Sequence, residues 1–127
     1  MHAQPSILIT DDDRHFRETL SSVLVHRGFR TLLAGDGEEA LHIIRTAEVH
    51  LLLVDMHMPK LTGLETLRLV KQVKAMLPCI LLSAQLDDVI REQAARAQAF
   101  SVLAKPVSRL EITRVVERAM QTAYGWA

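Results

Sequence analysis

The sequence has 127 residues, the length of one ordinary domain, and its 15 basic residues balance its 15 acidic residues. Because the formal net charge is 0, no overall positive charge favours binding to nucleic acid or to an anionic membrane, so we expect this chain to bind neither directly. The single cysteine excludes an intrachain disulfide, and no apolar run approaches the ~20 residues that span a bilayer. We therefore expect one soluble, cytoplasmic domain.

Five short apolar runs alternate with five longer stretches of helical spacing. The runs have the length of strands buried on both faces. This alternation predicts an α/β fold, a three-layer α/β/α sandwich on a doubly wound five-stranded parallel sheet. The helix near 87–97 has few large apolar residues, so we expect it to dock most weakly. The strands are expected at 7–9, 31–34, 51–54, 79–82 and 100–104, with helices that end at Gly28 or begin at Asp36, Thr62, Asp87 and Ser108.

Charged or hydroxyl side chains follow four of the five expected strands. Ligands bind at the carboxyl ends of strands in such sheets, so we expect these groups to converge. Crowded carboxylates repel one another unless a cation neutralises them, and hard oxygen ligands suit Mg²⁺. An ionised Asp can also act as a nucleophile toward phosphorus, a reaction that depends mostly on charge neutralisation. The residues are Asp11, Asp12, Asp13, Asp55, Ser83 and Lys105, of which Asp13 is interpreted as a helix cap.

The motifs resemble those of receiver domains in two-component response regulators. The matching segments are 7–13, 53–63, 82–84 and 105–106. The order and spacing match throughout, and the resemblance covers about residues 5–123 of an expected single receiver domain over residues 1–127. It implies a flavodoxin-like strand order of 2-1-3-4-5.

By this resemblance, Asp55 is the phosphoryl acceptor. Asp11 and Asp12 are the acidic pair that holds Mg²⁺, or Mn²⁺ in its place, together with Asp55 and the backbone carbonyl of His57. The chemistry expected from the residue types and the role implied by the family therefore agree on one acidic pocket.

The resemblance also assigns roles to residues around this pocket. Ser83 and Lys105 are the hydroxyl and the ammonium that bind the arriving phosphoryl group, and the Lys105–Pro106 peptide bond is expected to be cis. His57 and Gln85 occupy two variable positions that tune the lifetime of the phosphorylated form in this family. A solvated loop histidine is the alternative interpretation of His57.

Two positions depart from the family pattern. Val102 stands where receivers commonly carry the Tyr or Phe that swings inward on activation, so the aromatic switch is missing or altered. Phe100 would lie on the same face of a regular strand and could partly substitute, although packing in the core or under the fourth helix is the simpler interpretation. Gln98 replaces a common Gly, so its turn must avoid the left-handed region or carry strain.

The function implied is a phosphorylation switch and not a turnover enzyme. A histidine kinase or phosphotransfer protein would donate the phosphoryl group, and the face made by the helix near 87–97, the strand 100–104 and the helix from Ser108 would control an output domain or protein, or form a dimer. A degenerate receiver used only for docking stays open because of Val102. A phosphohydrolase with an aspartyl nucleophile would need an Asp where His57 stands, and a flavin or nucleotide module would need a phosphate-binding loop in place of the three aspartates at 11–13.

Overall fold

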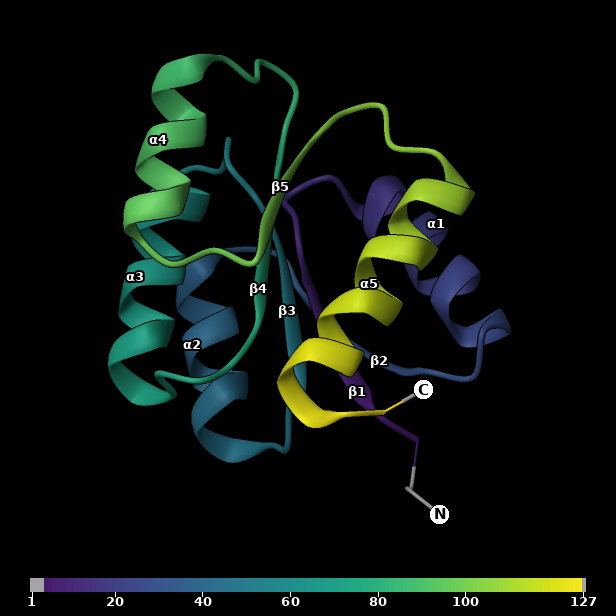
Figure 1. Ribbon diagram of the computed structural model, residues 1–127. Helices are drawn as coiled ribbons and strands as arrows, with labels where there is room; N and C mark the ends of the chain where they lie inside the picture. The colour runs from purple at the N-terminus through teal and green to yellow at the C-terminus, as the bar shows by residue number, and fades with distance from the viewer. Residues whose placement is uncertain (1–3, 127) are drawn as a thin grey trace.

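Five parallel strands form one sheet in the order β2-β1-β3-β4-β5 in the computed structural model, which describes residues 4–126 (Figure 1). The predicted fold and strand order are therefore confirmed. The strands are β1 (Ser6–Thr10), β2 (Arg30–Ala34), β3 (Leu51–Asp55), β4 (Cys79–Ser83) and β5 (Ser101–Ala104). The helices are α1 (Arg14–His26), α2 (Gly37–Thr46), α3 (Gly63–Val73), α4 (Asp88–Arg96) and α5 (Arg109–Tyr124).

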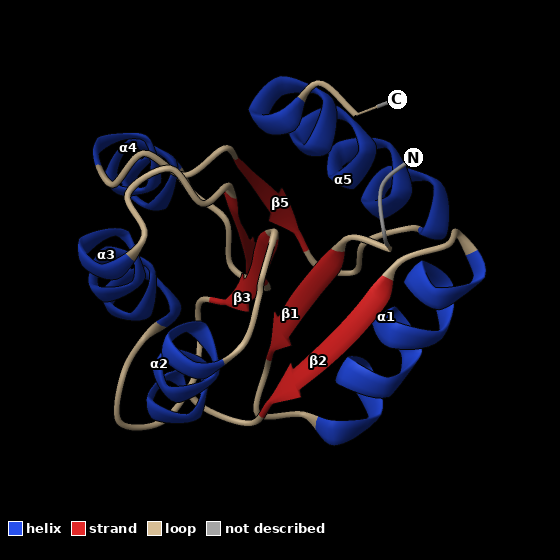
Figure 2. Cartoon of the chain, turned by 90° about the horizontal axis from the view of Figure 1, so that it is seen from below, coloured by secondary structure: helices blue, strands red, loops and turns tan. Residues whose placement is uncertain are grey.

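The helices divide between the two faces of the sheet. Figure 2 shows α1 and α5 on one face, with α2, α3 and α4 on the other. This division follows from right-handed crossovers that change direction at the centre of the sheet, between β1 and β3. The carboxyl ends of β1 and β3 therefore lie side by side, because the two strands are paired from Ile7 with Leu51 to Thr10 with Val54.

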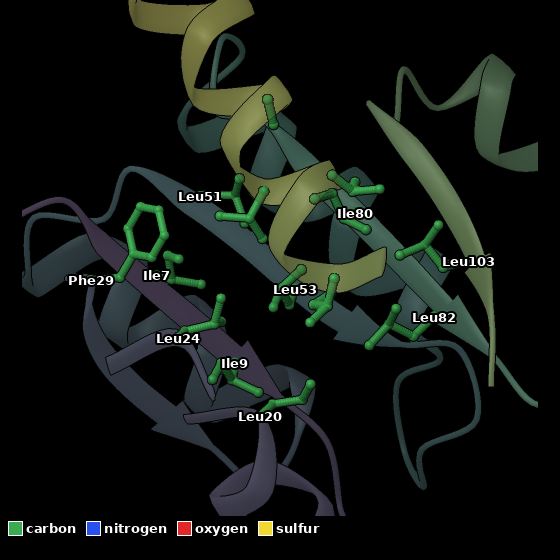
Figure 3. Close-up of a cluster of buried hydrophobic side chains, with 14 of the residues drawn as sticks. Ile7, Ile9, Leu20, Leu24, Phe29, Leu51, Leu53, Ile80, Leu82 and Leu103 are labelled. Carbon is green, nitrogen blue, oxygen red and sulfur yellow. The ribbon is translucent and has the colours of Figure 1, made fainter. Parts of the chain in front are cut away.

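Each face of the sheet carries its own aliphatic core. Side chains alternate between the faces, so Ile7 and Ile9 pack toward α1 and α5 (Figure 3). Leu8, between them in the chain, packs toward α2 and α3. The three central strands are almost completely buried, as expected. The edge strands β2 and β5 are only partly buried, contrary to the expectation of burial on both faces, because one side of each strand has no neighbour.

The helix starts follow the polar residues of the sequence. Asp13 caps α1 by accepting a hydrogen bond from the Phe16 backbone N–H at 3.2 Å. Thr62 begins α3 with a complete capping box. The box expected at Asp36 is only half formed, because the Glu39 side chain accepts from the Gly35 N–H instead.

Two helices end in the same hydrogen-bonded turn, one with glycine and one without. After α1, Gly28 adopts φ +92°, and the Phe29 N–H donates to the Leu24 carbonyl. After α4, Gln98 adopts φ +64°, and the Ala99 N–H donates to the Ala94 carbonyl. Gln98 therefore does not avoid the left-handed region and carries the strain that a glycine would not.

The helix α4 has the least apolar anchoring of the five. Ala94 is its one fully buried residue, with Ile90 partly buried beside it. By contrast, α3 buries Leu64, Leu67 and Val70. Weak docking of α4 was expected from its sequence. Within residues 4–126, no helix is both long and apolar enough to cross a membrane.

Candidate functional site

Three carboxylates meet at the carboxyl edge of the sheet. Asp11 follows β1, Asp12 comes next in the chain, and Asp55 ends β3. Each offers an oxygen, and these oxygens lie within 4.8 Å of one another. Asp11 and Asp55 are buried, whereas Asp12 is exposed, so the cluster opens to solvent on one side. The sequence predicted these three residues as one acidic pocket.

A close backbone approach holds the connection that follows Asp55. The Gly63 N–H donates to the Met56 carbonyl at 2.9 Å, which folds the start of α3 back over the end of β3. A Cβ atom built at Gly63 would collide with the backbone carbonyl of Asp55. Only glycine therefore fits at the start of α3 without moving the Asp55 backbone.

The Lys105 ammonium bridges two of the carboxylates. Its Nζ lies 2.7 Å from Asp11 Oδ2 and 3.1 Å from Asp55 Oδ1. The Lys105 backbone N–H donates to the Ser83 carbonyl at 2.9 Å, and the peptide bond to Pro106 is cis, the isomer expected for it. The side chain is 18% exposed, so the ammonium is largely withdrawn from water.

Burial and charge shift two titrating groups of the site. Desolvation and the neighbouring Asp11 carboxylate raise the pKa of Asp55, although bonding to Lys105 and the nearby His57 oppose them. Burial alone would lower the pKa of Lys105, but its bonds to Asp11 and Asp55 outweigh that effect and raise it. Without a further cation, the site therefore disfavours the ionised form of the Asp55 carboxylate.

Ser83 lies next to the acidic pocket at the end of β4. Its Oγ accepts a hydrogen bond from the Gln85 backbone N–H at 3.2 Å. His57, an exposed loop residue, places Nε2 3.3 Å from the same oxygen. Gln85 makes this contact through its backbone, so the sequence predicted that Gln85 lies near the site but not which of its atoms makes the contact.

Val102 and Phe100 lie on opposite sides of the sheet. Val102 packs partly buried against the core beneath α2, α3 and α4. Phe100 packs against the other core and lies 5.6 Å from the Arg118 guanidinium on α5. The expectation that Phe100 shares the face of Val102 is wrong, because β5 begins only at Ser101 and the regular alternation does not extend back to residue 100. Phe100 does not take the place of a ring at position 102.

Two site neighbours on α1 were not predicted. The Lys105 Nζ lies 3.9 Å from the centroid of the Phe16 ring. The Arg17 guanidinium donates to the backbone carbonyl of Asp11. Helical spacing assigned Phe16 to the buried face of α1, and nothing in that pattern indicates that the ring also reaches the charge of Lys105, the residue after β5.

The residues present fit a hard divalent cation. The three clustered side chains offer carboxylate oxygens, and the exposed side at Asp12 leaves room for the waters that Mg²⁺ retains. Burial and the neighbouring negative charge, which a bound cation would offset, are also what raise the pKa of Asp55. Cys79 is no candidate ligand or nucleophile, because burial raises the pKa of its thiol to about 12.

Comparison with known proteins agrees with this geometry. The family model for the response regulator receiver domain matches residues 7–117. The regulatory protein AtoC of Escherichia coli K12 is 32% identical over 95% of this chain, but the match covers 26% of AtoC. The transcriptional regulatory protein CpxR of the same organism is 31% identical over 93% of this chain and 50% of CpxR.

Solved structures of receiver domains agree with these sequence matches. The receiver domain of the Francisella response regulator 1452 is 28% identical, with a TM-score of 0.85 over 94% of this chain and 99% of that structure. The chain thus spans a quarter to a half of the two curated relatives and nearly all of this solved receiver domain. The matched segment includes every residue of the acidic pocket together with Ser83 and Lys105, and the chain belongs to the response regulator receiver domain family.

Proposed function

We propose that Asp55 accepts a phosphoryl group from a histidine kinase or a phosphotransfer protein. The observation that carries the proposal is the placement of Asp55 at the end of β3, buried, 3.1 Å from the Lys105 ammonium and clustered with Asp11 and Asp12. Membership of the receiver family supports the same assignment. In the reaction, an Asp55 oxygen bonds to phosphorus while the bond from phosphorus to the donor imidazole nitrogen breaks. The electron pair stays on that nitrogen, which takes a proton.

The surrounding side chains would balance the charge of this transfer. Lys105 is already beside Asp55 and can pair with an equatorial phosphoryl oxygen, and the Ser83 hydroxyl can donate to another. Asp11, Asp12, Asp55 and the backbone carbonyl of His57 would hold Mg²⁺ or Mn²⁺. A bound divalent cation would neutralise the carboxylates and the incoming phosphoryl oxygens.

The response would pass from Ser83 toward α4. For Ser83 to turn toward a phosphoryl group, its hydroxyl must leave His57 and the Gln85 N–H. Gln85 belongs to the connection that leads directly into α4, the helix with the least buried apolar surface. Because Val102 supplies no ring, this connection would carry the change to the face of α4, β5 and α5, where an output domain or partner protein, or a second copy, would read it.

Intact-mass spectrometry after incubation with Mg²⁺ and acetyl phosphate tests the proposal. We expect one added phosphoryl group on the wild-type chain and none on Asp55→Asn. Asp13→Asn is the matched control, because Asp13 lies near the pocket but caps α1, and Asn caps helices equally well. EDTA should abolish the modification.

Three outcomes would contradict the assignment. Modification that persists in Asp55→Asn would place the phosphoryl group elsewhere. A wild-type chain that takes up no phosphoryl group, while still folded, would favour a receiver used only for docking. Steady release of phosphate over many turnovers of a phosphomonoester would instead favour an aspartyl phosphohydrolase.

A further inference from the structure

The Lys105 ammonium has a third neighbour, which is uncharged. Two sides face Asp11 and Asp55, and the third faces the Phe16 ring, with Nζ 3.9 Å from the ring centroid. An ammonium over an aromatic face is attracted by the ring quadrupole, and the attraction grows as water is excluded. Lys105 is 18% exposed, so this contact is mostly desolvated.

The position of the ring is itself fixed by the local fold. Phe16 lies in the first turn of α1, where its backbone N–H is bonded to the capping Asp13 carboxylate. The ring also packs against the core between α1, α5 and the sheet. Phe16 is therefore anchored through its backbone and by the packing of its ring, whereas Lys105 has a four-carbon side chain that loses considerable rotamer freedom when held in one place.

We propose that Phe16 is a positioning residue that keeps the Lys105 ammonium beside Asp55. This inference rests on the proposed function, because Lys105 matters at that place only if Asp55 receives a charged group. Without the ring, Lys105 can turn its ammonium out to solvent, and the fraction of molecules with the ammonium in place falls. The rate of phosphorylation falls with that fraction.

Four variants separate positioning from simple packing. Phe16→Leu removes the ring and keeps an apolar side chain, and Phe16→Tyr keeps the ring. Phe100→Leu is the matched control, because Phe100 is also partly buried against the same core but lies against Arg118, away from the pocket. Lys105→Met removes the charge and keeps most of the side-chain volume.

The first measurement needs neither cation nor phosphoryl donor. In the proton NMR spectrum of the metal-free protein, the Lys105 methylene protons next to Nζ should be shifted upfield by the Phe16 ring. These signals are assigned by their loss in Lys105→Met. We expect the shift to disappear in Phe16→Leu and to persist in Phe16→Tyr and in Phe100→Leu. An unshifted signal in the wild-type protein would overturn the contact.

The second measurement is the rate of phosphorylation by acetyl phosphate at saturating Mg²⁺. We expect Phe16→Leu to be slower by between about two-fold and about thirty-fold, the range of a cation–π contact, while Phe16→Tyr and Phe100→Leu stay near the wild-type rate. In a Lys105→Met background, Phe16→Leu should have no further effect. An equal loss in both backgrounds would assign Phe16 to packing alone and overturn the proposal.

The two measurements also distinguish a failure of this proposal from a failure of the proposed function. A wild-type chain that takes no phosphoryl group overturns the proposed function and with it any effect of Phe16 on the rate, whereas the NMR shift decides on the contact by itself. If circular dichroism shows that Phe16→Leu is unfolded, Phe16→Met replaces it, since Met fills more of the volume of the ring without a π face.

Discussion

Asp55, the proposed phosphoryl acceptor, illustrates how a buried charged residue can weaken the fold that holds it. Burial and the Asp11 carboxylate raise its pKa in the folded chain above the unfolded value of ~3.9, despite Lys105. Between these two pKa values the folded chain binds more protons than the unfolded chain, so stability falls as pH rises through that window. The cost is fully present only at pH values above the folded pKa.

We therefore expect Asp55→Asn to raise the free energy of unfolding at pH 7 by roughly 1 kcal/mol, because Asn has the same shape and no charge. Urea denaturation of both chains at pH 7 and again at the acid end of the window measures the difference. The gain should shrink at the acid end. A variant less stable than wild type at pH 7 would mean that the attraction to Lys105 exceeds the cost of burial and repulsion.

Gln98 gives a second prediction at the residue scale. Its φ of +64° places a side chain in the left-handed region, in the same kind of turn that Gly28 makes after α1. We expect Gln98→Gly to stabilise the protein by about 0.5–1 kcal/mol. Glycine removes the steric cost of the left-handed conformation, and its greater conformational entropy in the unfolded chain offsets part of that gain. Thermal unfolding measures the change.

Gln93→Gly is the matched control for that substitution. Gln93 is also exposed but lies inside α4, where glycine should cost about 1 kcal/mol. Opposite signs for the two Gln→Gly changes would confirm the backbone argument. A loss of stability in both variants would contradict it.

At the scale of elements, α4 differs from the other helices by how little it buries. Only Ala94 is fully buried, so local opening of α4 exposes little apolar surface and costs little free energy. We expect backbone amides of α4 to exchange hydrogen much faster than those of α3, which serves as the internal control because it buries Leu64, Leu67 and Val70. Hydrogen exchange followed by mass spectrometry or NMR tests this. Equal protection of the two helices would argue against α4 as the mobile part of the response.

At the scale of the whole molecule, the end of the sheet opposite the pocket is closed by contacts between distant segments. The Tyr124 hydroxyl donates to the His50 carbonyl at 2.7 Å, and the Tyr124 ring stacks on Trp126 with centroids 4.3 Å apart. The His50 ring in turn accepts a hydrogen bond from the Ser6 N–H at 2.9 Å. These contacts connect the end of α5 to the starts of β1 and β3.

We expect Tyr124→Phe to lower the free energy of unfolding by about 0.5–1.5 kcal/mol, because it removes one partly buried hydrogen bond and keeps the ring. Chemical denaturation followed by the fluorescence of the single tryptophan measures it. The rate of phosphorylation should be unchanged, since the pocket lies at the other end of the strands. An unchanged stability would mean that water replaces the hydroxyl at the His50 carbonyl.

The sequence by itself determined the fold class and the acidic pocket, and the family resemblance carried by its motifs added the strand order. Hydrophobic periodicity, helix caps and parallel topology act over short distances or follow general rules, so they bring Asp11, Asp55, Ser83 and Lys105 to one edge without any knowledge of packing. The family motifs then indicated the chemistry of that edge.

Only the tertiary structure decided which side chains touch. The Phe16 ring under Lys105, the His57 contact with Ser83 and the placement of Phe100 away from Val102 all depend on small displacements between packed elements. A strand that begins one residue later moves a ring to the other face of the sheet, and a periodic pattern does not resolve such a shift. Contacts of this kind are set by the fit of whole elements against one another, which no local stretch of sequence contains.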